Sequence, residues 1–301
     1  MTGVDIVTDR RDELGEGPRW DAGRGELVSV DVLPGLLHRQ RWEHGALAEA
    51  DTTVLPAPLG CVAPADDGGW IAVTGQGIRR ESDGWQPAAT LEDVATGRVR
   101  PNDGACGPDG DLIVGTMAWD ASPGQGALWR VGGDGHARRL RGGCTIPNGI
   151  GWSPDGELMW WTDTAQGWIG AYRYADCDLV LPEPVRRVPV TDGSPDGLCV
   201  DAEGHLWVAL WGAGAVVRLT PEGREVQRVQ IPTAQPTATC LGGAGLTTLF
   251  ITSAWTGLDR AADALAGAVF AVEVDVPGTL PHTMRTAGPI PRADRPPGGR
   301  A

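Results

Sequence analysis

The sequence predicts an all-β fold, a six-bladed β-propeller of four-stranded antiparallel blades whose ring is closed by the N-terminal strand. The first observation is the number of glycines and prolines, 45 and 24 among 301 residues, because both residue types interrupt long helices. The second is that no ten-residue segment repeats its apolar residues every 3.6 positions. The third is an internal repeat that runs through the chain.

Each copy of the repeat is a glycine-containing turn followed by a short apolar strand. The six turn glycines are 41 to 48 residues apart, at positions 25, 68, 110, 156, 204 and 245. Four-stranded propeller blades have a period of this length. Helical repeats of similar length are the alternative, but the glycine and proline content disfavours them. Six copies therefore predict six blades.

The remaining segments are assigned in chain order. The apolar segment at 4–9 precedes the first copy, and we expect it to join the last blade and to remove the open edge of the ring. Residues 258–267 are the one helical candidate, and we expect a loop or a single turn there. We expect one propeller domain over residues 1–285. A disordered tail is expected over 286–301, because that stretch is rich in Pro, Gly and Arg.

Composition excludes several classes of function. The formal charge of −14 argues against a nucleic-acid partner and against an anionic membrane surface. No run of 18 apolar residues and no secretory signal is present, so we expect a cytoplasmic protein, a monomer or a small homo-oligomer. The six cysteines form no CxxC pair and are interpreted as reduced core thiols. The 13 tryptophans are interpreted mainly as packing between blades.

Polar residues recur at one phase of the repeat, a few residues before a repeat strand. Glu16 lies in LGEGPRW, Asn102 and Asp103 in RPNDG, Asn148 in PNGIGW and Asp196 in SPDGLCV. Blade symmetry would turn them toward the central axis, where carboxylate and amide oxygens suit a divalent cation such as Ca²⁺, Mg²⁺, Mn²⁺ or Zn²⁺. NDG, PNG and PDG are also ordinary turn tripeptides, and that alternative stays open.

Four segments together resemble the senescence-marker-protein/regucalcin/gluconolactonase family of six-bladed propellers. They are LGEGPRWD at 14–21, RPNDGACGPDGDLIVGTM at 100–117, PNGIGWSPDGELMWWTD at 147–163 and SPDGLCVDAEGHLWVALWGAGAVVRL at 194–219. The resemblance covers nearly the whole chain, although residues 32–99 match only loosely.

The resemblance implies one divalent cation, Ca, Zn, Mn or Mg, held by Glu16, Asn148 and Asp196. It also implies that Arg100 and Asn102 bind substrate, with Asp120 in GTMAWD as a further candidate.

The implied activity is hydrolysis of a sugar-acid lactone, a small-molecule substrate. A lactone is an ester, so its carbonyl must be polarised and a water delivered; a cation can do the first, and Asp196 is the candidate general base for the second. No GxSxG segment supports a serine nucleophile. Two alternatives remain: a non-enzymatic calcium- or ligand-binding propeller, and an enzyme of the same fold that acts on another ester or biosynthetic substrate.

Overall fold

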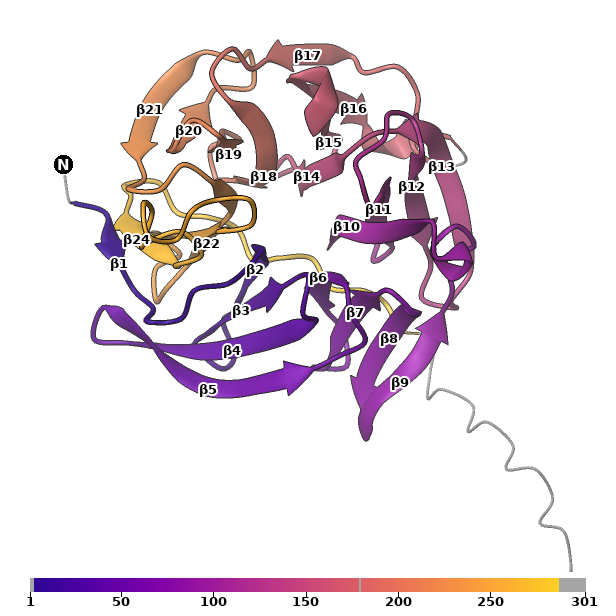
Figure 1. Ribbon diagram of the computed structural model, residues 1–301. Coiled ribbons are helices and arrows are strands. Elements are labelled where there is room, and N and C mark those ends of the chain that lie inside the picture. The colour runs from indigo at the N-terminus through magenta and orange to yellow at the C-terminus, as the bar shows by residue number, and fades with distance from the viewer. Residues whose placement is uncertain (1–2, 179, 287–301) are drawn as a thin grey trace, which may run out of the picture.

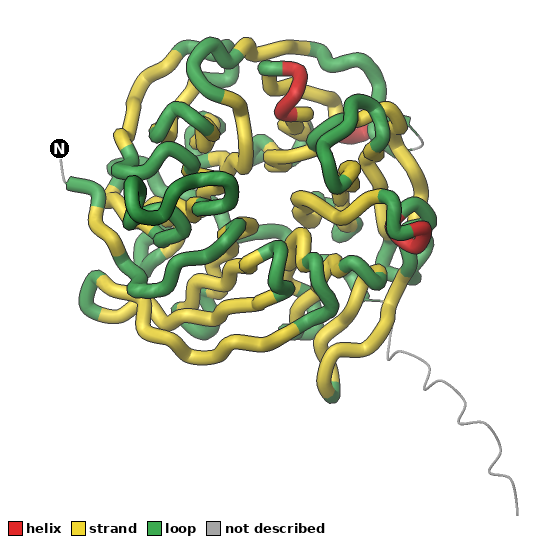
Figure 2. Tube along the Cα trace, in the orientation of Figure 1, coloured by secondary structure: helices red, strands yellow, loops and turns green. Residues whose placement is uncertain are grey.

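The structure is a computed structural model that describes residues 3–178 and 180–286. It contains six four-stranded antiparallel sheets arranged as blades around a central axis, as Figure 1 shows. Figure 2 shows that strands and loops make up nearly all of the described chain. Its helical elements are three single 3₁₀ turns, η1 (Val94–Thr96), η2 (Thr164–Gln166) and η3 (Tyr174–Asp176). The predicted all-β six-bladed propeller is confirmed.

The first five blades follow chain order, each beginning with its innermost strand. The first two contain β2 (Gly15–Asp21), β3 (Glu26–Asp31), β4 (Leu36–Glu43), β5 (Ala46–Val54), then β6 (Leu59–Pro64), β7 (Trp70–Thr74), β8 (Gly77–Ser82) and β9 (Gly84–Ala89). The third contains β10 (Val99–Cys106), β11 (Leu112–Ala118), β12 (Gly126–Val131) and β13 (Ala137–Cys144). The fourth and fifth contain β14 (Pro147–Trp152), β15 (Leu158–Asp163), β16 (Trp168–Arg173), β17 (Arg186–Pro189), then β18 (Ser194–Val200), β19 (Leu206–Trp211), β20 (Ala215–Leu219) and β21 (Glu225–Gln230).

The sixth blade combines the two ends of the described chain. Its strands from the axis outward are β22 (Pro236–Gly242), β23 (Thr248–Ser253), β24 (Phe270–Glu273) and β1 (Asp5–Ile6). In β1, Asp5 is the register partner of Ala271 and Ile6 that of Phe270. This outer strand is shorter than the segment at 4–9 that the sequence predicts. The helical candidate at 258–267 forms turns, as expected.

The hydrophobic core is a ring of six clusters, one between each pair of adjacent blades. Four tryptophans, Trp70, Trp160, Trp161 and Trp207, are at most 1% exposed within these clusters. Burial of such large side chains supplies most of the driving force for closing one blade face onto the next. Packing between blades thus accounts for these tryptophans, as the sequence predicts.

No helix in the part of the chain that the structure describes is long and apolar enough to cross a membrane. All six cysteines are free thiols, five of them buried. The tail expected over 286–301 lies outside the described residues except for Thr286. The cytoplasmic location and the oligomeric state stay predictions.

Candidate functional site

Every innermost strand contains a β-bulge at the repeat phase that the sequence singled out. The register of each innermost strand against its neighbour shifts between Glu16 and Arg19, Leu59 and Cys61, Pro101 and Gly104, Asn148 and Ile150, Pro195 and Leu198, and Pro236 and Thr239. A bulge re-aims the side chain that it carries and occurs often beside active sites. The NDG, PNG and PDG tripeptides therefore lie inside strands β10, β14 and β18, and the turn interpretation is wrong.

The glycine of these tripeptides allows neighbouring blades to approach at the axis. A Cβ atom on Gly149 would lie 2.4 Å from the backbone oxygen of Asp196. One on Gly197 would lie 2.3 Å from the Cβ of Ala238 in the next blade. Real Cβ atoms do not come so close to other heavy atoms, so both positions need glycine. This contact places Asn148 beside Asp196.

The three predicted metal ligands are brought together and are all buried. Glu16 is 8% exposed, and Asn148 and Asp196 are each 4% exposed. Glu16 Oε2 accepts a 3.1 Å hydrogen bond from its neighbour Gly17 N, and Asn148 Nδ2 donates to Thr164 Oγ1 at 3.2 Å. The Oδ1 atoms of Asn148 and Asp196 are buried without a hydrogen-bond partner among the described residues. Two acceptor oxygens buried in this way need a partner, because an unsatisfied buried polar atom costs about 1–3 kcal/mol.

Electrostatics link these ligands to Arg100. Burial, with repulsion from Asp103, raises the pKa of Glu16 to about 8. Burial and the neighbouring Glu16 also raise the pKa of Asp196 well above its usual range. Arg100 is 8% exposed, and burial lowers its pKa to about 10 against the opposing influence of Glu16 and Asp196. Two carboxyl groups and one guanidinium therefore interact in a nearly dry site.

Asp103 and Arg19 belong to the same electrostatic cluster. Asp103 is among the polar residues expected at the axis, whereas Arg19 has no predicted role. Asp103 is 6% exposed, and Arg19 Nη2 lies 3.7 Å from Asp103 Oδ1. Arg19 Nη2 also donates to Gly104 O at 2.8 Å, so this side chain reaches from the first blade to the third. Both residues stand in the quoted LGEGPRW and RPNDG segments. For Arg19, the overlooked signal is a second charged residue in LGEGPRW, at the end of the register shift that begins at Glu16.

Both polar atoms of the Asn102 side chain are hydrogen-bonded within the protein. Its Oδ1 accepts a 2.8 Å hydrogen bond from Arg100 Nη1, and its Nδ2 donates to Pro147 O at 2.9 Å. The side chain thus joins the third blade to the fourth and orients Arg100. We expect Asn102 to act on a substrate mainly through Arg100.

Asp120 and its neighbour Trp119 lie at the exposed end of the third blade, beyond β11. Asp120 is exposed, and its Oδ1 accepts a 3.0 Å hydrogen bond from Ser122 N. Hydrogen bonds from Ser122 lower the pKa of Asp120. Trp119 is 54% exposed and donates through Nε1 to Gly97 O at 3.2 Å. The structure gives Asp120 no contact with the buried cluster, and its substrate role stays a prediction.

The donor set fits a divalent cation. The electrostatic cluster contains three carboxyl groups, on Glu16, Asp103 and Asp196, and two guanidinium groups, on Arg19 and Arg100. When all five groups are ionised, the cluster has a net negative charge. The two unpaired oxygens of Asn148 and Asp196 are hard ligands of the kind that Ca²⁺, Mg²⁺ and Mn²⁺ prefer. Among residues 3–178 and 180–286, no three His, Cys, Asp or Glu side chains are close enough to hold a metal. A cation here would thus have two carboxylates and one amide as side-chain ligands, with Asp103 outside the ligand set.

Comparison with known proteins gives consistent matches. Residues 14–255 match the model of the SMP-30/Gluconolactonase/LRE-like region. A pentonolactonase of Haloferax volcanii is 34% identical over 91% of this chain and 96% of its own length. A 6-deoxy-6-sulfogluconolactonase of Pseudomonas putida is 34% identical over 88% of this chain and 92% of its own length. The crystal structure of a calcium-binding protein, regucalcin, from Agrobacterium tumefaciens superimposes with a TM-score of 0.85 at 27% identity, covering 94% of this chain and 98% of that one.

Proposed function

Because the chain belongs to the SMP-30/gluconolactonase/LRE-like family, we propose that it is a metal-dependent hydrolase that opens a sugar-acid lactone. The observation that carries the proposal is the pair of unpaired buried oxygens on Asn148 and Asp196, beside Glu16 and Arg100. Relatives named as lactonases, 34% identical to this chain, support the reaction class. Glu16, Asn148 and Asp196 would hold the cation.

The cation would supply Lewis acidity to the lactone carbonyl. Asp196 accepts the proton of the attacking water as that water forms a bond to the carbonyl carbon. The carbon–oxygen bond of the ring then breaks, and the ring oxygen leaves as a hydroxyl by taking up the proton from Asp196, which returns to the carboxylate form. Asp196 has two carboxylate oxygens, so one can ligate the cation while the other accepts the proton.

Arg100 is the group best placed to bind the substrate. Its guanidinium is held by hydrogen bonds from Nη1 to Asn102 Oδ1 and to Pro101 O, at 2.8 and 3.0 Å. A fixed guanidinium donates to carbonyl and hydroxyl oxygens at defined angles, and this geometry orients the lactone for attack. Because the site is buried and polar, it favours a substrate rich in hydroxyl groups.

The test compares metal-free wild-type protein with its Glu16→Gln variant. Addition of Zn²⁺, Mn²⁺ or Ca²⁺ to the metal-free wild type should restore hydrolysis of an aldonolactone at one ion per chain. Glu16→Gln keeps the size of the side chain but removes a charged ligand, so it should need a much higher metal concentration. Equal metal requirements for the two proteins would contradict the assignment of Glu16.

A second candidate is a calcium-binding protein without catalysis, which the similarity to a regucalcin supports. Calcium takes six to eight oxygen ligands and is bound most tightly where carboxylates are numerous. Here only two carboxylates and one amide converge, and Arg100 adds a positive charge that a calcium store does not need. The geometry therefore favours the hydrolase, and the lactone assay separates the two. The same assay would also reveal an enzyme acting on another ester.

A further inference from the structure

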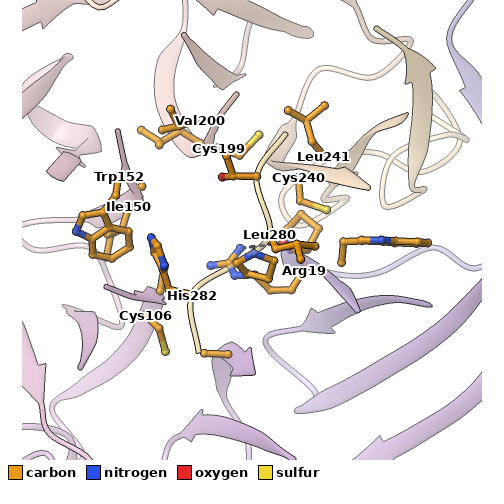
Figure 3. Close-up of a pocket in the computed structure, with 18 of the residues that line it drawn as sticks. Arg19, Cys106, Ile150, Trp152, Cys199, Val200, Cys240, Leu241, Leu280 and His282 are labelled. Atoms are coloured by element: carbon orange, nitrogen blue, oxygen red, sulfur yellow. Dashed lines mark hydrogen bonds between the residues drawn. The ribbon is translucent and has the colours of Figure 1, made fainter. Parts of the chain in front are cut away.

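A cavity lies in the channel, at the ends of the innermost strands away from the metal ligands. Figure 3 shows this cavity, with Arg19 in its middle and the thiols of Cys106, Cys199 and Cys240 around it. Arg19 stands three residues after Glu16 on β2, and Cys199 three residues after Asp196 on β18. The cavity measures about 100 Å³. This volume exceeds that of single water molecules but is small beside sites for sugar-sized ligands.

The lining of the cavity is rich in donors and poor in acceptors. No Asp or Glu is among the described residues that line it, in a chain with 39 acidic residues. Burial raises the pKa of Cys106 and of Cys199 to about 12, so both thiols stay protonated. Burial lowers the pKa of His282, which keeps its imidazole neutral. The guanidinium of Arg19 is therefore the charged group of this lining.

The Arg19 guanidinium has more N–H donors than hydrogen bonds. It carries five N–H groups. Among the hydrogen bonds of the described residues it makes two, from Nη1 to Pro18 O and from Nη2 to Gly104 O, both 2.8 Å long. The Asp103 carboxylate lies 3.7 Å from Nη2 but does not line the cavity. Free donors of a guanidinium that lines a cavity attract an anion.

The C-terminal segment closes this end of the channel. Thr279, Leu280, Pro281 and His282 form one wall of the cavity. Gly278 N donates to Leu246 O at 2.9 Å in the sixth blade, and Met284 N donates to Pro64 O at 2.8 Å in the second. The five residues between these anchors, 279–283, are held at both ends, and Leu280 is 55% exposed. An ion that enters from this face would pass beside the 279–282 segment.

We propose that this cavity is a binding site for a small monovalent anion, a halide or a short carboxylate, held by Arg19. The anion accepts from the free guanidinium N–H groups, with the protonated Cys106 and Cys199 thiols as weaker donors. None of Glu16, Arg100, Asn148 and Asp196 lines this cavity, so the site is distinct from the proposed lactone site. It needs neither the metal nor lactonase activity, and its test is independent of both.

The test is a thermal-stability titration with bromide and, separately, with formate, at constant ionic strength balanced by a bulky sulfonate. Binding to the native state raises the melting temperature with anion concentration. We expect this rise in the wild type and its loss in Arg19→Met. Arg228→Met removes an exposed arginine paired with Asp192 and Glu225, and should keep the rise. A rise with bromide alone would assign the site to halides, and a rise with formate alone to carboxylates.

Arg19→Met also removes the positive side chain that pairs with Asp103, and this variant can fail to fold. Cys199→Leu provides a second variant, because it fills the cavity without changing any charge near Asp103. It should abolish the anion-dependent rise. A crystal soaked in bromide should show an anomalous peak beside the Arg19 guanidinium. Absence of that peak, or an equal rise in wild type and Cys199→Leu, would overturn the proposal.

Discussion

Arg100 Nη1 donates a 2.8 Å hydrogen bond to Asn102 Oδ1, two residues further along β10. Asn102 is itself anchored through Nδ2 to Pro147 O of the fourth blade. The position of the guanidinium thus depends on contact between the third and fourth blades. Asn102 lies in the bulge between Pro101 and Gly104, whereas Arg100 precedes it in regular register with Met117.

Asn102→Ala removes the acceptor for Arg100 and the donor to Pro147. We expect KM for a lactone to rise about 10-fold or more, since hydrogen bonds to charged groups contribute about 1.5–3 kcal/mol. Steady-state kinetics at saturating metal measure this change. A rise in KM that exceeds the fall in kcat would support a role in positioning Arg100. An unchanged KM would show that Arg100 does not need Asn102.

Asp196→Asn tests the proposed general base. The amide keeps the volume of the side chain but cannot accept a proton, so kcat should fall by about 10²–10⁴-fold. Since burial raises the pKa of Asp196, the neutral amide removes an unfavourable buried charge. The metal-free variant should therefore unfold at a temperature no lower than that of the wild type. Turnover within a few-fold of the wild type would exclude Asp196 as the base.

Gly149→Ala tests the close approach of blades at the axis. The added Cβ would lie 2.4 Å from the Asp196 backbone oxygen, which cannot move without shifting β18. We expect a loss of about 1–3 kcal/mol in the free energy of unfolding, measured by denaturant titration. Gly245→Ala is the matched control, because its Cβ would come no nearer than 3.5 Å to the Thr247 hydroxyl. Equal stabilities for the two variants would contradict the packing argument.

His38 predicts a pH dependence of stability in the first blade. Burial, with repulsion from Arg10, lowers its pKa from 6.5 to about 3. Between these values the unfolded state binds a proton that the folded state does not. Stability is therefore lost as the pH falls below 6.5, with a slope of at most about 1.4 kcal/mol per pH unit.

His38→Gln removes the titrating group and should flatten this part of the pH profile, measured by thermal unfolding between pH 4 and 7. His44, an exposed residue at positive φ, offers His44→Asn as a control that should leave the profile unchanged. If His38→Gln keeps the slope of the wild type, another group is responsible for the acid sensitivity.

The repeat made the fold predictable, because each turn glycine marks a local hairpin. Gly110 and Gly156, for example, have φ of +85° and +74° in the turns that follow β10 and β14. The shared phase of the repeat also predicted that the polar side chains of Glu16, Asn148 and Asp196 would turn toward the axis, and all three are buried there. Their selection as a ligand set came from the family resemblance rather than from spacing.

Features that depend on contacts across the ring were not predictable from spacing. Arg19 reaches Gly104 across 85 positions of the chain, and its pairing with Asp103 exists only when the ring is closed. The glycine of PNG has the sequence pattern of a turn, and only the approach of Asp196 shows why glycine is required. The closing segment at 279–282 has no periodic pattern that could indicate its position.

The central claim is tested most directly by continuous proton-release assays over a panel of five- and six-membered sugar lactones, with and without chelator. The account predicts hydrolysis of at least one aldonolactone in the metal-replete protein. The chelator should abolish this activity, and Zn²⁺, Mn²⁺ or Ca²⁺ should restore it. A metal-replete, folded protein that hydrolyses none of these lactones would contradict the account, as would hydrolysis that the chelator leaves unchanged.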